Sequence, residues 1–449
     1  MGVMRVRVNK MTFILFLIAG SLLGAAECQA KPLDVELVWR FSQAGWLEIR
    51  VEEGAYRFDD GQTEERLTAG ASLQVGWGGW TPVRRLNQDV FAMTASSLRL
   101  LDEEHGGCFS VRLPGEKEYV YRGDLIIDWQ EDHWRLINRL EEEEYLKGVV
   151  PIEMSNAWAG DGLEALKAQA VAARTFMAKH TQGGRGITDS PDVDQAYGGK
   201  NAEGEASEAV AATRSEILVD ALSGEPIDAF YSAHNGGYTE EAENVWGNPD
   251  EHYSAHADDF SRGVGGAADQ WQFTVAASQL GRAFGLTPVR QVTLEKYPSG
   301  RVKTVTLTDR DGETRLLSGR ALVRAFYPYG REISSDSFLG SLFEVSFLPS
   351  AAPDRLSKAV DWLRNRFQSE ERRGQSAGSR TEPILRSVWE IMSEGRADGV
   401  FTFQGHGWGH GVGMSQWGAY HMAQMGFSYR DILRYYYEQT ELAELRPTT

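Results

Sequence analysis

The chain has 449 residues, of which 42% are hydrophobic and 24% are charged. A chain of this length and composition can bury a large core and is expected to form two or more lobes. The formal net charge of −18 argues against a nucleic-acid-binding protein, because such a protein needs a basic face.

The first 30 residues have the pattern of an export signal. A positive start with Arg5, Arg7 and Lys10 precedes an apolar run at residues 11–23, and small residues follow it. We predict that this segment is removed, that the mature chain keeps Cys108 and no internal disulfide, and that the protein works in the cell envelope, in the periplasm or in the extracellular wall. An uncleaved membrane anchor is the alternative.

Residues 31–118 are predicted to form a β-rich N-terminal region. Leu47, Ile49 and Val51 alternate with charged neighbours, which is typical of a half-buried strand. A hairpin is predicted over residues 121–138, with its polar turn near Glu131 and Asp132.

Residues 119–449 are predicted to form a mixed helix and strand domain, so the fold class is α+β. Asp161 and Glu164 resemble a capping box at the start of an alanine-rich helix. Strands are expected over residues 288–320, and a helical insertion over residues 350–399. Further helices are expected at residues 415–425 and after Ser428, which Asp431 follows three positions later. One face of the alanine-rich helix is expected to be buried, with Leu163, Leu166, Ala170 and Ala173.

The stretch GHGWGHGVG at residues 405–413 alternates glycine with larger side chains. Such a segment is a poor helix and is predicted to be extended, so that His406, Trp408, His410 and Val412 share one face and the other face is bare backbone. Two histidines four residues apart on a strand are separated by roughly 13 Å, too far to bind one zinc ion. We therefore predict the wall of a groove that another backbone or a ligand approaches closely; a tight crossing in the core is the alternative.

Glu153 follows Pro151 and Ile152 and has other apolar neighbours, including Met154 and Trp158. A carboxyl group held among apolar side chains has a raised pKa and can act as an acid near neutral pH. The alternative is a surface glutamate that precedes a helix.

Two later loops carry polar and aromatic residues together. Residues 192–199 read DVDQAYGG, and residues 230–248 combine tyrosine, histidine, three glutamates and tryptophan around a Gly-Gly turn. Aromatic rings beside amides and carboxylates commonly line sugar sites, although ordinary polar turns have a similar composition.

These segments resemble the stage II sporulation protein D family and its amidase-enhancer relatives. The resemblance covers about residues 120–260, 285–345 and 400–440. It rests on the blocks YLKGVVPIEM, LEALKAQAVAARTF, DVDQAYGG, YSAHNGGYTEEAENVWG and GHGWGHGVGMSQWGA, the last with GFSYRDILRYYY after it, which occur in the family's order.

The resemblance implies that the substrate is peptidoglycan. Members of the sporulation branch are lytic transglycosylases that act on glycan strands stripped of stem peptides, and their catalytic glutamate matches Glu153. Some members hold zinc with cysteine and histidine ligands near the block that reads YSAHNGGY here. This chain has only His234 there, with His252 and His256 in the following loop, so we predict no metal site and no cofactor and keep zinc as an open alternative.

We therefore predict an exported enzyme that binds peptidoglycan and cleaves its glycan strands by lytic transglycosylation, giving a 1,6-anhydro end, with Glu153 as general acid/base. The alternative is a non-catalytic enhancer that binds peptidoglycan and stimulates a cell-wall amidase. A zinc hydrolase is a third hypothesis, which the lack of an H-E-x-x-H or paired-cysteine pattern disfavours. The side chains predicted to bind substrate are Tyr197, Tyr231, His234, Glu243, Trp246, Trp408, His410 and Gln416.

Overall fold

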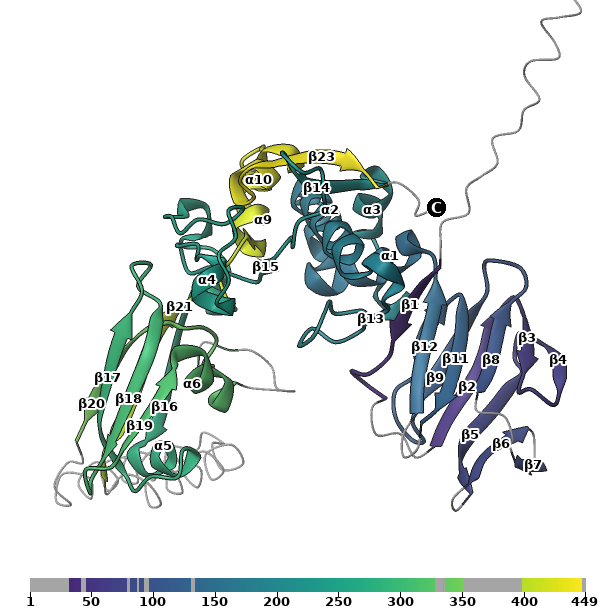
Figure 1. Ribbon diagram of the computed structural model, residues 1–449, viewed down its shortest axis with the longest axis horizontal. Helices are drawn as coiled ribbons and strands as arrows, with labels where there is room; N and C mark the ends of the chain where they lie inside the picture. Colours follow the sequence, from purple (N-terminus) through teal and green to yellow (C-terminus); the bar gives the residue numbers. More distant parts are fainter. Residues whose placement is uncertain are drawn as a thin grey trace, which may run out of the picture.

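The structure is a computed structural model that describes residues 32–41, 46–78, 81–86, 89–92, 97–130, 134–327, 334, 336–349 and 398–445. The predicted export signal, the hairpin turn at Glu131 and Asp132, and almost all of the predicted insertion lie outside these residues. The described chain forms an arch, with a β-rich N-terminal part, a helical centre and a second β-rich lobe (Figure 1). Its helices and strands across several sheets confirm the α+β class.

The N-terminal part contains two sheets, of order β13-β1-β12-β11-β8-β3-β4 and β10-β9-β2-β5-β6-β7. All neighbours are antiparallel except β1 and β13, which run parallel. The strands are β1 (Leu33–Glu36), β2 (Trp46–Glu53), β3 (Ala55–Asp59), β4 (Glu64–Thr68), β5 (Ser72–Gly78), β6 (Thr81–Leu86), β7 (Asp89–Ala92), β8 (Ser97–Asp102), β9 (Cys108–Arg112), β10 (Tyr119–Arg122), β11 (Asp124–Trp129), β12 (Trp134–Leu140) and β13 (Ile187–Thr188).

Period-two alternation decides which way these strands face. Leu47, Ile49 and Val51 of β2 are each no more than 1% exposed, which confirms the predicted half-buried strand. The predicted hairpin is also confirmed, because β11 and β12 pair from Asp124–Arg139 to Trp129–Trp134.

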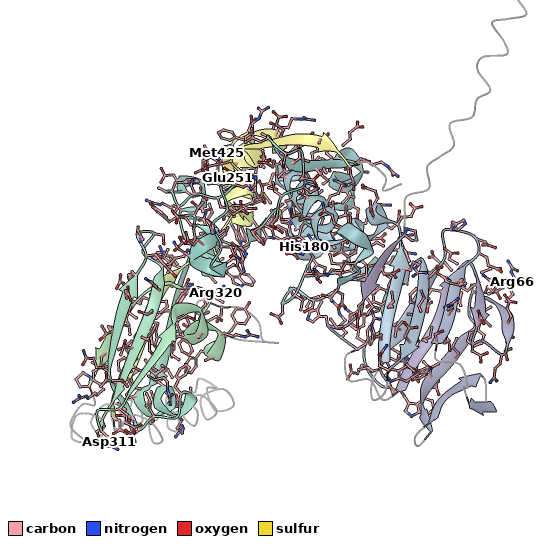
Figure 2. All side chains as sticks on the ribbon, viewed as in Figure 1. Arg66, His180, Glu251, Asp311, Arg320 and Met425 are labelled. Atoms are coloured by element: carbon pink, nitrogen blue, oxygen red, sulfur yellow. The ribbon has the colours of Figure 1, made fainter. Side chains whose placement is uncertain are left out.

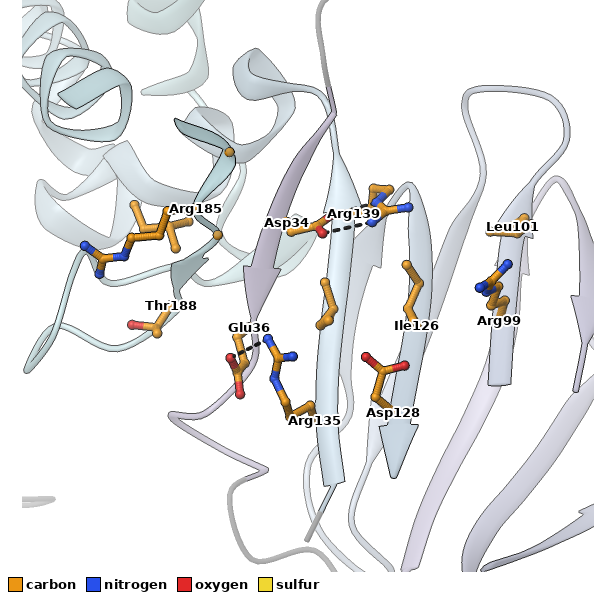
Figure 3. Close-up of a pocket in the computed structure, with 14 residues that line it drawn as sticks. Asp34, Glu36, Arg99, Leu101, Ile126, Asp128, Arg135, Arg139, Arg185 and Thr188 are labelled. Atoms are coloured by element: carbon orange, nitrogen blue, oxygen red, sulfur yellow. Dashed lines mark hydrogen bonds and ion pairs between the residues drawn. The ribbon is translucent and has the colours of Figure 1, made fainter. Parts of the chain in front are cut away.

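The face of the seven-stranded sheet that points away from the first hydrophobic core is charged. It carries a hollow of about 770 Å³ beside β13 (Figure 3). Its arginines are largely neutralised in place: Arg139 makes two hydrogen bonds to Asp34, and Arg135 lies 3.1 Å from Glu36. None of its lining residues is a predicted site residue.

The helical centre is formed by α1, α2, α3, α9 and α10, with two short sheets that pair β14 with β23 and β15 with β22. The residues of α2 from Ala168 to Met177 are buried, which confirms the predicted central helix. The elements are α1 (Glu142–Glu153), η1 (Asn156–Trp158), α2 (Leu163–His180), η2 (Gln182–Gly184), η3 (Gly199–Ala202), α3 (Ser207–Ala212), β14 (Glu216–Asp220), β15 (Tyr231–Ser232), α4 (Ala242–Trp246), η4 (Asp259–Ser261), β22 (Met414–Ser415), α9 (Gln416–Gln424), α10 (Tyr429–Tyr436) and β23 (Thr440–Glu444).

Of the two predicted helix caps, one is confirmed and one is wrong. Ser428 and Asp431 form a capping box at α10. The N-cap of α2, in contrast, is Gly162, with no side-chain cap. Asp161 instead accepts hydrogen bonds from Tyr420 and Gln424 of α9, so a tertiary contact has replaced the local one.

The second lobe packs two three-stranded antiparallel sheets, β16-β21-β20 and β17-β18-β19, with two helices. The strands predicted over residues 288–320 are confirmed as β17, β18 and β19. The elements are η5 (Gly266–Ala268), β16 (Gln270–Ala276), α5 (Ala277–Ala283), β17 (Val289–Lys296), β18 (Val302–Asp309), β19 (Thr314–Ser318), α6 (Gly319–Phe326), β20 (Leu342–Leu348) and β21 (Val400–His406).

The described residues form two separate hydrophobic cores. The first runs from the N-terminal sheets through the central helices, and the second lies inside the second lobe around Phe338, Phe343 and Phe403. In the described part of the chain, no helix is both long enough and apolar enough to span a bilayer.

Candidate functional site

Glu153 is the last residue of α1, close to the point where the helix gives way to η1. The alternative of a surface glutamate that precedes a helix does not describe this placement, because Glu153 ends one. The placement matters electrostatically, because the C-terminal end of a helix carries partial negative charge and disfavours an ionised carboxylate. The residue is half-buried.

Three donors from distant parts of the chain surround the carboxyl group of Glu153. The backbone N–H of Ala196 lies 3.0 Å from Oε1, and Nε2 of Gln416 lies 3.5 Å from Oε2. The Tyr231 side chain also makes a hydrogen bond to this carboxyl group. Glu153, Tyr231 and Gln416, which are predicted site residues, are therefore brought together.

The protonation of Glu153 reflects a balance of opposing effects. Burial raises its pKa to about 7, and the hydrogen bonds from Ala196, Gln416 and Tyr231 act in the lowering direction. A carboxyl group with this pKa carries its proton for about half of the time at pH 7, so Glu153 can both donate and accept a proton near neutrality.

A buried layer of polar groups holds these donors. Oε1 of Gln169 accepts from Gln416 at 3.3 Å. Gln195 donates to the Tyr231 hydroxyl at 3.0 Å and accepts from the Tyr145 hydroxyl at 3.2 Å. Sequence analysis missed Gln169, Gln195 and Tyr145. The available signal was a glutamine in the middle of the apolar face of α2, where burial demands a polar partner.

The glycine-rich stretch differs from the predicted extended segment. Strand β21 ends at His406, and Gly407, Gly409, Gly411 and Gly413 then all have left-handed φ, between +68° and +108°. The backbone therefore changes hand at every second residue, a conformation that favours glycine.

Neighbouring chain approaches the glycine-rich stretch closely, in line with the predicted wall. A Cβ added at Gly413 would lie 2.1 Å from the carbonyl oxygen of Phe230, and one at Gly411 would lie 2.0 Å from Nη2 of Arg301. Arg301 is 2% exposed and donates to the carbonyl groups of Asn235 and Tyr238, so it supports the turn that faces the glycines.

Trp246 and His410 meet in a second group, with Phe230. The Phe230 and Trp246 rings stack at 4.1 Å, and His410 meets Trp246 at 5.0 Å between ring centroids. Burial lowers the pKa of His410 to about 3, and the Arg320 guanidinium (labelled in Figure 2) acts in the same direction. His410 is therefore neutral at physiological pH, and its Nδ1 accepts from the Val412 N–H at 3.0 Å.

Three other predicted substrate-binding residues make contacts within the fold. Tyr197 is 1% exposed and donates to Asn138, so it belongs to the core. His234 is fully buried; Nδ1 accepts from the Gly236 N–H, which leaves Nε2 to donate to the Val264 carbonyl. Trp408 packs against the second core and donates to the Tyr327 hydroxyl. Glu243 is exposed on α4, away from any described partner at its carboxyl group.

The residues that the structure describes contain no group of three or more histidine, cysteine, aspartate or glutamate side chains arranged to hold a metal ion. His252 is half-buried in a turn, where its ring lies 2.6 Å from Asp250 and 3.3 Å from Asp220. His256 lies 3.1 Å from the Thr239 hydroxyl.

Comparison with known proteins identifies the family of this chain. The family model described as Stage II sporulation protein matches residues 130–219, which include α1, α2 and Glu153. The chain belongs to the stage II sporulation protein D and amidase-enhancer family, which is related to the bacterial cell wall.

Individual relatives differ in how much of their length is matched. The chain is 30% identical to the amidase enhancer of Bacillus subtilis over 80% of its own length, but spans only about half (48%) of that protein. It is 27% identical to stage II sporulation protein D of Bacillus subtilis, covering 69% of this chain and 76% of the relative. An uncharacterised protein of Brachyspira hyodysenteriae is 31% identical over 72% of each chain.

Proposed function

We propose that this protein is exported to the cell envelope and cleaves peptidoglycan glycan strands by lytic transglycosylation, with Glu153 as general acid and base. The observation that carries the proposal is the Glu153 carboxyl group, whose pKa of about 7 leaves it able to hold a transferable proton among fixed hydrogen-bond donors. Neutral His410 is unsuited to that role.

The reaction requires only one such group. Glu153 protonates the glycosidic oxygen as the bond from that oxygen to the anomeric carbon breaks. That anomeric carbon belongs to a muramic acid residue of the strand. The C6 hydroxyl of the same muramic acid attacks the anomeric carbon and gives its proton to the Glu153 carboxylate, which restores the acid. No water is consumed, and the product has a 1,6-anhydro end; a second carboxylate to activate water, as in inverting glycosidases, is not needed.

The Glu153→Gln variant tests the acid. Glutamine keeps the shape and an oxygen acceptor for the Ala196 N–H but cannot donate a carboxylic proton. Turnover should fall by about two to four orders of magnitude while glycan binding is retained. Mass spectrometry of purified glycan strands should find anhydro ends with the wild type only; turnover at the wild-type rate by the variant would remove Glu153 from the mechanism.

The pH profile provides a second test. Since Glu153 must be protonated to act, wild-type turnover should decline as pH rises through about 7. A rate that rises across the same interval would contradict a protonated acid.

A non-catalytic enhancer is the second candidate, and the amidase enhancer among the relatives is the observation that favours it. In this case the partner is a cell-wall amidase. If neither the wild type nor Glu153→Gln cuts glycan strands, yet both accelerate amidase release of stem peptides equally, the enhancer function holds and the transglycosylase is excluded.

A further inference from the structure

Three aromatic side chains gather on η1 and α9, the elements that carry the residues after Glu153 and its partner Gln416. Trp158 ends η1, which begins three residues after Glu153. Trp417 and Tyr420 are the second and fifth residues of α9, whose first residue, Gln416, has its amide 3.5 Å from the Glu153 carboxyl group. We call these three side chains the aromatic trio.

The trio forms a connected set of rings. Trp158 stacks on Tyr420 with 4.4 Å between centroids and 23° between planes, and meets Trp417 at 4.7 Å and 61°. Trp417 and Tyr420 are nearly perpendicular at 5.9 Å. All three side chains are partly exposed, and Trp417 belongs to neither hydrophobic core. Packing in a hydrophobic core therefore does not explain why a tryptophan stands at position 417.

The rings are held in place by their surroundings. The Tyr420 hydroxyl donates to Asp161 at 2.7 Å, and Gly162 packs so closely that an added Cβ would lie 2.4 Å from the Tyr420 ring. Gly265 packs against Trp417 in the same way, at 3.0 Å. A rigid aromatic surface loses little conformational entropy when a ligand covers it.

Polar groups lie at the border of the trio. The exposed Asp161 accepts from Tyr420 and from Gln424, which is also exposed. Aromatic surface with a few placed polar groups is the usual composition of a small-ligand site, and it suits a pyranose ring, which has apolar C–H faces and hydroxyl groups at its edge. The Asp161 carboxylate repels the carboxylate of muramic acid and leaves the neutral N-acetylglucosamine residue as the better occupant.

We propose that Trp158, Trp417 and Tyr420 form a subsite that stacks on an N-acetylglucosamine ring of the glycan strand next to the residue over Glu153. The inference rests on the proposed function for the identity of the strand. The location beside Glu153 gives the subsite its purpose, because a ring held here fixes the position of the neighbouring glycosidic bond relative to the carboxyl group.

Binding is measured by calorimetry with a β-1,4-linked tetramer of N-acetylglucosamine in the Glu153→Gln background, where no cleavage complicates the titration. Trp417→Ala should weaken binding about tenfold, which corresponds to about 1.4 kcal/mol, and Trp417→Phe should lose less. Trp39→Ala is the matched control, because Trp39 is 44% exposed in the N-terminal part, and it should bind as tightly as the parent. Unchanged binding when Trp417→Ala is added to Glu153→Gln, or no binding of the tetramer by Glu153→Gln itself, overturns the subsite.

Hydroxyl-radical footprinting of the parent protein gives the same answer without a Trp417 substitution that could disturb folding. The tetramer should protect Trp417 from oxidation and leave Trp39 as reactive as before; equal oxidation of Trp417 with and without tetramer overturns the subsite. The two proposals fail separately. Normal tetramer binding by Trp417→Ala with loss of cleavage in Glu153→Gln removes only the subsite, whereas Trp417-dependent binding by a wild type that never cleaves removes only the transglycosylase.

Discussion

At the scale of single residues, Glu153 gains its chemistry from its surroundings and not from its type. Burial and three donors from elsewhere in the chain set its protonation. The donors oppose the burial, so each of them controls the pH range in which Glu153 can act as an acid.

Gln416→Leu tests that control. The Gln416 amide lowers the pKa of Glu153, so its loss should raise that pKa and move the alkaline decline of turnover to higher pH. Gln404→Leu is the control, since Gln404 is exposed on β21 and, among the described residues, its side chain makes a hydrogen bond to Gln272 and none to Glu153. A decline that stays in place, or moves to lower pH, would contradict the assigned role of Gln416.

The raised pKa of Glu153 also predicts a stability effect that needs no substrate. In the unfolded chain this carboxyl ionises near 4.5, and in the folded chain near 7. Its contribution to stability is thus complete below about pH 4.5 and is lost as pH rises to 7. Glu153→Gln removes the loss, so between pH 4 and pH 8 the variant should gain up to about 3 kcal/mol relative to the wild type in denaturant unfolding. Parallel pH curves for the two proteins would argue against the raised pKa.

At the scale of elements, the glycine-rich stretch owes its path to close neighbours. Gly411 combines a φ of +79° with an Arg301 guanidinium where a Cβ would be. Gly411→Ala should therefore cost at least about 2 kcal/mol of unfolding free energy, from backbone strain and displacement of Arg301.

The control for Gly411 is Gly106→Ala, because nothing lies within 4 Å of an added Cβ at Gly106. Gly204, which the sequence suggests as an open loop position, is unsuitable, since a Cβ there would lie 2.6 Å from the Asn156 side chain. Equal melting temperatures for Gly411→Ala and Gly106→Ala would show that the close approach carries no energetic weight.

Local patterns were predictable from the sequence, and contacts across long separations were not. The alternation of β2, the buried face of α2 and the Ser428 cap each depend on residues a few positions apart, and each is confirmed. The Asp161 cap failed because Tyr420, 259 residues away, competes for the same carboxylate. For the same reason the sequence drew attention to Glu153 and its apolar neighbours but not to Gln195, whose importance appears only once the chain is folded.

At the scale of the whole molecule, the two hydrophobic cores predict two regions of separable stability. Phe403 is fully buried at the centre of the second core, so Phe403→Ala should cost about 3–5 kcal/mol there. Hydrogen exchange should speed up in β16, β20 and β21 while α2 keeps its protection. Phe109→Ala, in the first core, should give the reverse pattern, and uniform loss of protection in both variants would indicate one cooperative unit.

The contact between Glu153 and Gln416 joins residues 263 positions apart. During synthesis at about 5–20 residues per second, the ribosome needs roughly 13 to 50 s to add that length of chain. A nascent chain that already contains Glu153, α1 and most of α2 consequently lacks the Gln416 amide, which lowers the pKa of Glu153, and also lacks Trp417. Under the proposed function, translation products that stop before Gln416 lack this amide and are expected to have a Glu153 carboxyl group that is not adjusted for cleavage of glycan strands.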